Sequence, residues 1–523
     1  MEKNLNLPEI NKEYLDVGEY LNSDNFTEVT NYLTDVLKQG LKFKIRDSVY
    51  KKSDYLSLYE TLSEPVPEQG ISLEELLVFV QHNIIDNSTN FSSPYSMAFP
   101  DSGNAVSALA GSILSDCLNQ NLINWSPCAP SATVVEVVVI EWLRQLIGFE
   151  INTCRSRKPV DAGGMITSGG VASNTIALML AREKFFPDSM LTGIKEPDKL
   201  AVIVPDGIDH YSSRLSAGWL GIGEEQVIKS PTKQFKYDLN ALLDNLQSLS
   251  KEGKRPFFIV AYAGDSRTMT CDDFKALREI ADAYGAWLHI DACQGGQLLF
   301  CPELRSRVDG IEYADSVTLD PHKVLTLPYA LSALIVRSPT DIQRISRPED
   351  IITGEAHSFG QITPLFGSRP FSSLKLYMLI KNLGREGIAD LIQKRLKLAK
   401  DFAQLVLQDN DLVLVNPDVH VNSVAFMYYP QQYREFIKTS DNQIELFNRV
   451  NTKIQSALFD SGKTWLHNFE IPDLHNVIGL GIKTRLRPLR FMSGNPNTTS
   501  AHIQDAIRYV KDVGAEILLK ELE

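Results

Sequence analysis

The chain has 523 residues, of which 43% are hydrophobic and 22% are charged, so it is long enough to bury a large core in roughly one to three domains. Its formal net charge of −13 argues against nucleic acid or an anionic membrane as the main partner, because both require a basic face. The six cysteines form no C-x-x-C pair, which argues against a zinc site and indicates reduced thiols. No apolar run approaches the roughly 18 residues of a membrane span, and the polar N-terminus lacks the apolar core of a signal peptide. We therefore expect a cytoplasmic protein that binds neither nucleic acid nor membranes.

Residues 1–115 are predicted to be mostly helical, with loops rich in Pro, Ser and Asn at residues 63–70 and 87–103. From about residue 130 onward, apolar runs of strand length alternate with helical segments. Such runs are typical of strands covered on both faces, and the alternation predicts a mostly parallel sheet in an α/β domain. The strand candidates are residues 201–205, 257–263, 286–292, 315–319 and 331–337.

A helix is predicted between two of these strands, at residues 272–284. Thr270 and Asp273 have the spacing of a capping box, and Gly285 follows as a stop signal. After residue 385, a long amphipathic helix leads into short strands at 413–415 and 423–427 and a closing helix at 502–513. We expect three parts: an N-terminal helical segment (1–115), a large α/β domain (116–385) and a small C-terminal α+β domain (386–523).

A glycine pair, Gly169 and Gly170, follows an apolar run and precedes a helix predicted at residues 175–183. The free N–H groups and partial positive charge at the start of a helix could bind a phosphate. A plain tight turn before a helix has the same composition, and this segment alone supports both interpretations about equally.

Two charged residues follow consecutive buried strands: Asp291 ends one strand, and Lys323 comes just after the next. In open α/β sheets, ligands bind beyond the carboxyl ends of the strands. A carboxylate there could pair with a protonated ring nitrogen, and a lysine could form an imine with an aldehyde cofactor. Taken alone, such an aspartate is more often a cap of the following loop, and such a lysine is more often solvated.

His210 follows the strand predicted at residues 201–205. Its imidazole could stack on a planar ring or carry protons. A surface histidine in a loop is an equally good interpretation of this residue alone.

Together, these segments resemble the group II PLP-dependent amino-acid decarboxylases, which include glutamate, aromatic-amino-acid and diaminobutyrate decarboxylases. The resemblance implies the aspartate-aminotransferase type of fold (fold type I), pyridoxal 5′-phosphate (PLP) as cofactor, and a homodimer with shared active sites. It also implies a lyase of amino-acid metabolism that converts an L-amino acid to its amine and carbon dioxide. The matching segments, in the family's order and spacing, are TSGGVASNTIALMLAR, PDGIDHYSS, AYGAWLHIDACQGG, YADSVTLDPHKVLTLPYALSALIVR, GSRPFSSLKLYMLIKNLGREG and LRFMSGNPNTT.

The resemblance further implies a role for each matching residue. Lys323 corresponds to the Schiff-base lysine, Asp291 to the partner of the pyridine nitrogen, and His210 to the histidine stacked on the ring. The cofactor-binding residues so implied are Gly169, Gly170, Val171, His210, Tyr262, Asp291, Cys293, Asp320, His322, Lys323 and Ser368. The substrate-binding residues so implied are Phe99, Pro100, Asp101 and Arg369.

Two of these assignments carry further expectations. Ser368 and Arg369 match a segment that, in the family, reaches the active site of the partner subunit. Asp101 lies in the substrate loop, where an acid would favour a substrate with a basic amino group, although loop acids usually face water.

The sequence departs from the family pattern near the cofactor. Val324 stands where most members have a tryptophan, a change expected to alter packing rather than chemistry. Where many members have Thr-x-Gly-Thr-Thr, this chain has residues 262–266, YAGDS. Tyr262 places a phenol near the ring, and Asp265 would repel an anionic substrate if it faced the pocket.

A third departure concerns the acid that protonates the α-carbon. Aromatic-amino-acid decarboxylases use a tyrosine on a mobile loop, but no tyrosine occurs between Arg337 and Arg369 in this sequence. His357 is the catalytic candidate in that loop, although it could equally be an exposed residue. If Phe359 takes the tyrosine's place, the reaction could shift toward oxidative deamination, as in the plant aldehyde synthases.

Other functions therefore stay open beside decarboxylation. One is a PLP-dependent aldehyde synthase or carbon–carbon lyase on the same fold. Another is a binding or scaffold protein that has lost catalysis, against which the joint presence of Lys323, Asp291 and His210 argues. The side chain of the substrate is not identified by the sequence.

Overall fold

The computed structural model describes residues 21–150, 158–347, 357–362, 367–437 and 441–523, which divide into two compact units. The described part of the first unit, up to residue 45 and from 53 to 88, contains helices α1 (Phe26–Lys44), α2 (Tyr55–Leu62) and α3 (Leu73–Asn83). A capping box starts α3: Ser72 Oγ accepts from the Glu75 N–H, and the Glu75 carboxylate accepts from the Ser72 N–H. None of these helices buries a residue, so their apolar side chains are at least partly exposed within the chain.

The second unit, residues 46–52 and 89 onward, is built around a seven-stranded sheet with strand order β1-β9-β8-β7-β6-β2-β3. Strands β3, β2, β6, β7 and β8 run parallel, whereas β9 pairs antiparallel with both β8 and β1. Every residue of β2, β7, β8 and β9 is buried, as expected for strands covered on both faces. The strands are β1 (Gly164–Thr167), β2 (Leu200–Pro205), β3 (Val227–Ser230), β6 (Arg255–Tyr262), β7 (Trp287–Asp291), β8 (Ser316–Leu319) and β9 (Ser332–Val336).

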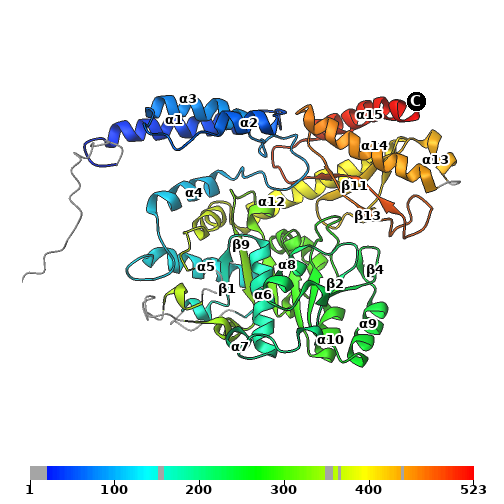
Figure 1. Ribbon diagram of the computed structural model, residues 1–523, viewed down its shortest axis with the longest axis horizontal. Helices are drawn as coiled ribbons and strands as arrows, with labels where there is room; N and C mark the ends of the chain where they lie inside the picture. Colours follow the sequence, from blue (N-terminus) through cyan, green and yellow to red (C-terminus); the bar gives the residue numbers. More distant parts are fainter. Residues whose placement is uncertain (1–20, 151–157, 348–356, 363–366, 438–440) are drawn as a thin grey trace, which may run out of the picture. The chain divides into compact units, whose positions relative to one another are not determined.

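Helices cover this mostly parallel, mixed sheet (Figure 1). The α/β fold predicted from the sequence is confirmed, and all five predicted strands are present with small shifts at their ends. The helices around the sheet are α4 (Val106–Leu118), α5 (Pro130–Ile147), α6 (Gly170–Phe185), α7 (Ser189–Thr192), α8 (Ser212–Trp219), α9 (Leu239–Lys251), α10 (Phe274–Tyr284) and α11 (Pro321–Val324).

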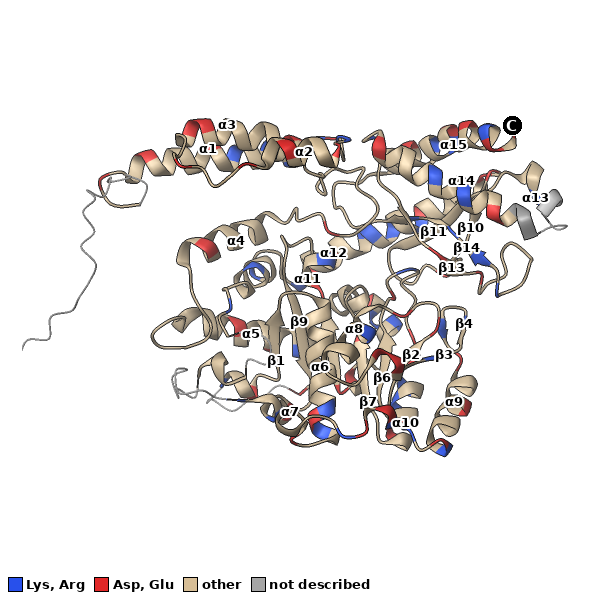
Figure 2. Cartoon of the chain, in the orientation of Figure 1, with Lys and Arg blue, Asp and Glu red and all other residues tan. Residues whose placement is uncertain are grey.

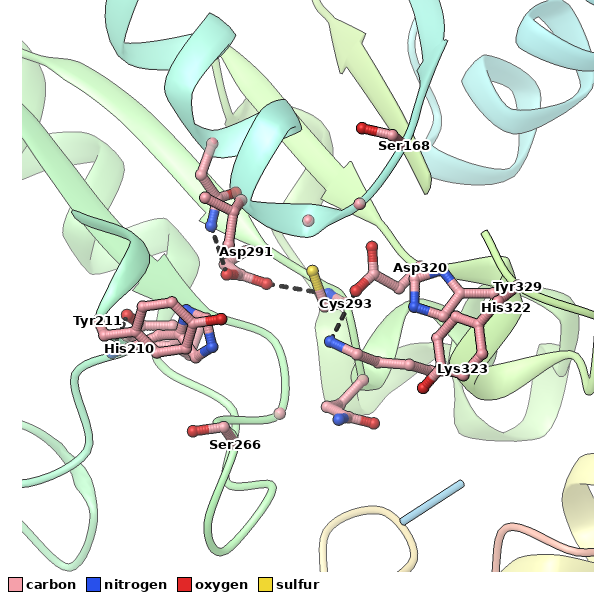
Figure 3. A pocket seen from close by; sticks show the side chains of 17 residues that line it. Ser168, His210, Tyr211, Ser266, Asp291, Cys293, Asp320, His322, Lys323 and Tyr329 are labelled. Carbon is pink, nitrogen blue, oxygen red and sulfur yellow. Dashed lines mark hydrogen bonds and ion pairs between the residues drawn. The ribbon is translucent and has the colours of Figure 1, made fainter. Parts of the chain in front are cut away.

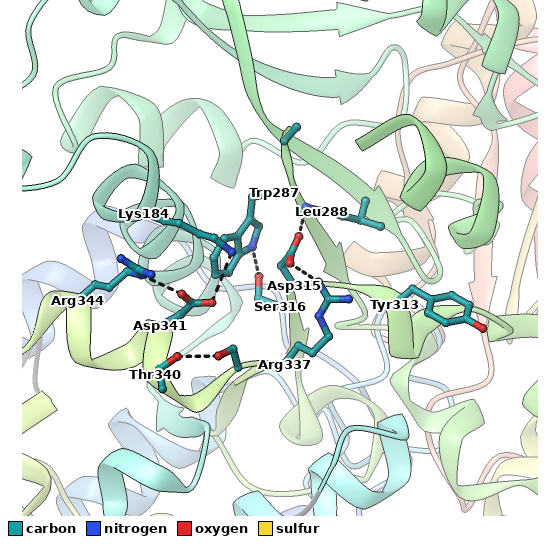
Figure 4. A network of polar contacts seen from close by, with 12 residues as sticks. Lys184, Trp287, Leu288, Tyr313, Asp315, Ser316, Arg337, Thr340, Asp341 and Arg344 are labelled. Atoms are coloured by element: carbon teal, nitrogen blue, oxygen red, sulfur yellow. Dashed lines mark hydrogen bonds and ion pairs between the residues drawn. The ribbon is translucent and has the colours of Figure 1, made fainter. Parts of the chain in front are cut away.

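A polar network fixes the amino ends of β7 and β8 (Figure 4). The carboxylate of Asp315 accepts hydrogen bonds from the Leu288 N–H at 2.9 Å, from Arg278 at 2.8 Å and from Arg337 at 2.6 Å. Trp287 Nε1 donates to Ser316 Oγ at 2.8 Å. These contacts join β7, β8 and the end of β9, and they hold the strands whose opposite ends carry Asp291 and Asp320.

The C-terminal part forms a smaller α+β region with its own hydrophobic cluster, in which the rings of Phe402 and Phe491 stack at 4.2 Å. Its four-stranded antiparallel sheet has the order β10-β11-β15-β12. The long helix α12 (Ser373–Gln408) is interrupted at Gly384, whose φ of 63° suits glycine. The other elements are β10 (Leu412–Leu414), β11 (Ser423–Tyr428), α13 (Gln431–Ile437), α14 (Asp441–Asp460), β12 (His467–Asn468), β15 (Leu489–Met492) and α15 (Ser500–Leu522), with the two-stranded pairs β4 (Thr232–Lys233) and β5 (Lys236–Tyr237), and β13 (Ile471–Pro472) and β14 (Arg485–Leu486).

The sequence misplaced some helix ends. The N-cap of α10 is Asp273, which accepts from the Ala276 N–H at 3.1 Å, so the capping box predicted at Thr270 was wrong. The N–H of Thr270 instead donates to the buried carboxylate of Asp265 at 2.8 Å. The division into three parts at residues 115 and 385 stays a prediction.

Acidic and basic residues are interleaved along most helices of the chain (Figure 2). Within the residues that the structure describes, no helix is both long enough and apolar enough to cross a membrane.

Candidate active site

A cavity of about 240 Å³ lies at the carboxyl ends of β6, β7 and β8, beside the start of α6 (Figure 3). The structure brings Lys323 on α11, Asp291 at the end of β7 and His210 after β2 into this one cavity. The lining residues are Ser168, Gly169, Gly170, Val171, Asn174, His210, Tyr211, Tyr262, Gly264, Ser266, Asp291, Cys293, Gln294, Asp320, His322, Lys323 and Tyr329.

Lys323 lies on the one-turn helix α11, which begins directly after β8 because Pro321 suits the first position of a helix. Its Nζ lies 2.7 Å from Asp320 Oδ2. Burial would lower the pKa of Lys323, but the Asp320 carboxylate outweighs burial, and the pKa is raised above that of an ordinary lysine. The other oxygen of Asp320 accepts a hydrogen bond from Ser332 Oγ, which fixes the orientation of the carboxylate.

Asp291, the last residue of β7, is buried in the cavity wall. Its Oδ2 accepts from Asn174 Nδ2 at 2.9 Å, and its Oδ1 accepts from the Cys293 N–H at 3.1 Å. Burial would raise the pKa of Asp291, but His210, these hydrogen bonds and Lys323 lower it below the ordinary aspartate value. Asp291 is therefore held as a carboxylate, ready to pair with a cationic ring nitrogen.

A chain of buried hydrogen bonds supports Asp291 from behind. Asn174 Oδ1 is 3.1 Å from His289 Nε2, and His289 Nδ1 is 2.8 Å from Ser316 Oγ. Burial lowers the pKa of His289 to about 4, so its ring is neutral at neutral pH. The sequence interpretation assigned no role to Asn174, although it lies in the first turn and a half of the helix that follows the glycine pair.

His210 lies in the connection between β2 and α8. Its Nδ1 is 2.8 Å from Ser212 Oγ, and its backbone N–H donates to the Tyr262 hydroxyl at 2.8 Å. Burial lowers the pKa of the His210 imidazole, with Asp291 opposing the shift, which favours a neutral ring. The phenol of Tyr262 thus holds the segment that carries His210.

The glycine pair approaches the same cavity closely. A Cβ at Gly170 would lie 2.8 Å from Cys293 Sγ and 3.0 Å from Asp320 Oδ2, so a larger residue would displace one of them. Gly170 opens α6, a helix of 16 residues, whose N-terminus suits an anion. An amine, a buried carboxylate and a helix N-terminus around one cavity are the groups that PLP requires, and the residues present fit that cofactor.

Some residues implied by the resemblance do not line this cavity in their own chain. Ser368 and Arg369 line a second cavity of about 340 Å³, where Arg369 forms a buried ion pair with Glu136 at 2.9 Å. His357 packs its ring against Trp125, with centroids 5.2 Å apart, and Phe359 is fully buried.

The residues of the predicted substrate loop do not line this cavity. The ring of Phe99 packs against Trp465 and His467. Pro100 packs closely on Gly494: a Cβ added at Gly494 would lie 2.1 Å from the Cα of Pro100. Burial, together with the nearby carboxylate of Asp101, raises the pKa of Tyr329.

Asp265 does not face the cavity. It is fully buried, and its oxygens accept hydrogen bonds from the N–H groups of Arg267, Thr268 and Thr270, each at 2.8 Å. Asp265 was expected to repel an anionic substrate only if it faced the pocket, so this repulsion does not apply.

Comparisons with known proteins agree with this geometry. The family model described as the pyridoxal-dependent decarboxylase conserved domain matches residues 56–429. The chain is 29% identical over 423 residues to an L-2,4-diaminobutyrate decarboxylase of Rhizobium meliloti, covering 79% of each protein. It is 28% identical to a tyrosine decarboxylase of Papaver somniferum, covering 92% of each, and 26% identical to a phenylacetaldehyde synthase of Petunia hybrida, covering 97% of each.

Solved structures show the same fold. The crystal structure of mouse CSAD in apo form has a TM-score of 0.83 at 23% identity, covering 93% of this chain and 99% of that one. The structure of Oryza sativa TDC with PLP and tryptamine has a TM-score of 0.83 at 21% identity, covering 95% of this chain and 99% of that one.

Proposed function

Because the chain belongs to the pyridoxal-dependent decarboxylase family, whose members use PLP to decarboxylate amino acids, we propose that its Lys323 cavity is where this reaction takes place. The observation that carries the proposal is the meeting of Lys323, Asp291 and His210 around one cavity at the carboxyl ends of the parallel strands. Ligands of open α/β sheets bind at this edge.

When bound, PLP supplies an aldehyde that joins an amine and a pyridinium ring that accepts the electrons of the breaking bond. Lys323 would hold the aldehyde carbon, since its amine opens into the cavity. Asp291, kept ionised by Asn174 and the Cys293 N–H, would keep the ring nitrogen protonated. The neutral imidazole of His210 would cover the ring, and the start of α6 at Gly169, Gly170 and Val171 would hold the phosphate.

The residues of the chain would also decide which bond breaks. The bond aligned with the ring's π-system is the one weakened, so the groups that orient the substrate's carboxylate select decarboxylation. Phe99, Pro100, Asp101 and Arg369 are the residues proposed for substrate binding, and Ser368 and His357 remain proposals for the cofactor and the catalytic steps.

An aldehyde synthase is the second candidate function. Two observations favour it: the loop between Arg337 and Arg369 has no tyrosine, and a phenylacetaldehyde synthase is among the similar proteins. This reaction consumes dioxygen and releases aldehyde, ammonia and peroxide along with carbon dioxide, so its products separate it from simple decarboxylation.

We also propose that the enzyme works as a homodimer in the cytoplasm. The exposed apolar side chains of α1, α2 and α3 support association, because contiguous exposed apolar surface is typical of interaction sites. The free thiols of Cys117, Cys128, Cys271, Cys293 and Cys301 support a reducing compartment. Sedimentation of the purified protein at two concentrations measures directly whether it is a dimer.

A substrate screen tests the proposed function. The PLP-loaded protein is incubated with each common amino acid and with diaminobutyrate and ornithine, and carbon dioxide, amine and peroxide are measured together. The proposal predicts carbon dioxide and amine in equal amounts, without peroxide, for at least one amino acid. Peroxide and aldehyde would identify the second candidate, and no carbon dioxide from any amino acid would refute both.

A further inference from the structure

Loss of carbon dioxide leaves the α-carbon in need of a proton, and one group of the cavity is placed to provide it. We propose that Tyr329, which lines the cavity beside Lys323, donates this proton. The inference rests on the proposed function, since it names the acid of the same site.

Tyr329 lies on the wall of the cavity that holds Lys323. Figure 3 shows its ring beside the Lys323 side chain. The ring of His322, whose Nδ1 donates to the Leu331 carbonyl at 2.7 Å, packs against Tyr329 with centroids 4.9 Å apart. The substrate's α-carbon must lie within two bonds of the atom that replaces Lys323 Nζ, so a group beside this side chain is within reach of it.

The carboxylate of Asp101 acts electrostatically on the phenol of Tyr329. The loop of Asp101 is fastened on two sides: the Ala105 N–H donates to the Thr326 carbonyl at 3.2 Å, and Pro100 packs on Gly494. One carboxylate oxygen of Asp101, Oδ1, is buried without a hydrogen-bond partner. Burial raises the pKa of Asp101, and burial together with Asp101 raises the pKa of Tyr329. The phenol therefore stays protonated at neutral pH.

The other candidates are less well placed. The amine of Lys323 is held by the Asp320 carboxylate at 2.7 Å. His357 packs on Trp125 and does not line the cavity of its own chain. Tyr329 is thus a hydroxyl of the cavity that lies beside Lys323 and next to the half-buried carboxyl of Asp101.

The proton is transferred to the α-carbon in one step, and Tyr329 is reprotonated in a second. The O–H bond of Tyr329 breaks as the C–H bond forms at the α-carbon. The phenolate then takes up a proton from the Asp101 carboxyl, when that group is protonated, or from solvent, to which Tyr329 is 58% exposed. Decarboxylation of an amino acid to an amine consumes one proton, and this route supplies it.

Product configuration tests the proposal. Decarboxylation in deuterium oxide places one deuterium on the α-carbon, and a fixed donor delivers it to one face. In Tyr329→Phe, amine output should fall by roughly 10²–10⁴-fold, the usual contribution of a positioned acid, and the remaining amine should be a mixture of both configurations. Tyr313→Phe, which alters an exposed tyrosine on the connection into β8, is the matched control and should keep the wild-type rate and single configuration.

Two results would overturn the assignment. A single configuration retained in Tyr329→Phe would mean that another fixed group donates. A mixture obtained in His357→Phe, with Tyr329→Phe unchanged, would assign the donor to His357. If the wild-type protein releases no carbon dioxide from any amino acid, the proposed function itself fails.

A measurement on the cofactor-free protein tests the Tyr329–Asp101 pair independently of turnover. Fluorotyrosine is incorporated at position 329 and its ionisation is followed by fluorine NMR. Asp101→Asn removes a nearby negative charge, so the fluorotyrosine at position 329 should ionise at lower pH in this variant. An identical titration in both proteins would contradict the pairing.

Discussion

The carboxylate of Asp320 lies 2.7 Å from the ε-amine of Lys323, one helical turn away on α11. This pair keeps the amine protonated, because the carboxylate outweighs the effect of burial on the pKa of Lys323. An amine must be neutral to attack an aldehyde, so Asp320 is also the nearest acceptor for the proton that Lys323 has to lose.

Replacing Asp320 by Asn should shift cofactor capture to lower pH. Without the carboxylate, burial dominates and the pKa of Lys323 falls, so more of the amine is neutral at pH 7. The rate at which the cofactor-free protein develops imine absorbance, measured against pH, checks this. An unchanged pH profile would show that Asp320 does not control the amine.

The same pair makes a pH-dependent contribution to stability. The pKa of Lys323 is raised in the folded protein, so its contribution is fully present below the ordinary lysine pKa and is lost as the pH rises through the raised value. The cofactor-free wild-type protein should therefore be more stable to urea than Asp320→Asn at pH 7, with the difference shrinking at strongly alkaline pH. If the stability difference between wild type and Asp320→Asn grew as the pH rose, the predicted direction of the pH dependence would be wrong.

Asp291→Asn should lower kcat by about 10²–10³-fold while the cofactor stays bound, because a preorganised charge is lost at the ring nitrogen. Steady-state kinetics and the bound-cofactor absorbance measure the two effects separately. A kcat within tenfold of the wild-type value would remove Asp291 from the proposed mechanism.

Asn174→Ala should reduce kcat by roughly 10- to 100-fold, since a hydrogen bond to a charged group contributes about 1.5–3 kcal/mol. Losing the Asn174 donor also raises the pKa of Asp291, so the acidic limb of the pH–rate profile should move to higher pH. Gln81→Ala, which alters a residue in α3, serves as the control. An unmoved acidic limb would show that Asn174 does not hold the Asp291 charge.

The sequence predicted the parts of the site that depend on chain-local signals. Apolar runs located the strands, and Asp291 and Lys323 could be placed because Asp291 ends one buried strand and Lys323 comes shortly after the next. The hydrogen bonds between Asn174 on α6 and Asp291 and His289 on β7 join a helix to a strand more than a hundred residues away, and no spacing in the chain encodes such contacts. The same holds for the Tyr329–Asp101 pair, whose members are more than two hundred residues apart.

Arg369 illustrates the other limit of sequence interpretation. The resemblance of its segment to the family implied that Arg369 binds substrate. Within its own chain, however, its guanidinium donates to Glu136 and to the Ile166 carbonyl, each at 2.9 Å. Burial raises the pKa of Glu136, with Arg369 opposing the shift, so the carboxylate depends on this partner for its charge.

Arg369→Met should therefore destabilise the protein by about 3–5 kcal/mol, because it leaves a buried carboxylate without a partner. Adding Glu136→Leu should recover much of this loss, since both charges are then absent. Urea denaturation of the single and double variants measures the effect. Equal stability of wild type and Arg369→Met would show that the pair contributes nothing to folding.

The most direct test of the account is chemical mapping of the cofactor attachment point. The PLP-loaded protein is reduced with borohydride, digested, and its peptides are sequenced by mass spectrometry. The account predicts a single pyridoxyl group, on Lys323, and none in Lys323→Ala, which should remain folded and inactive. Attachment to another lysine, or full turnover by Lys323→Ala, would contradict it.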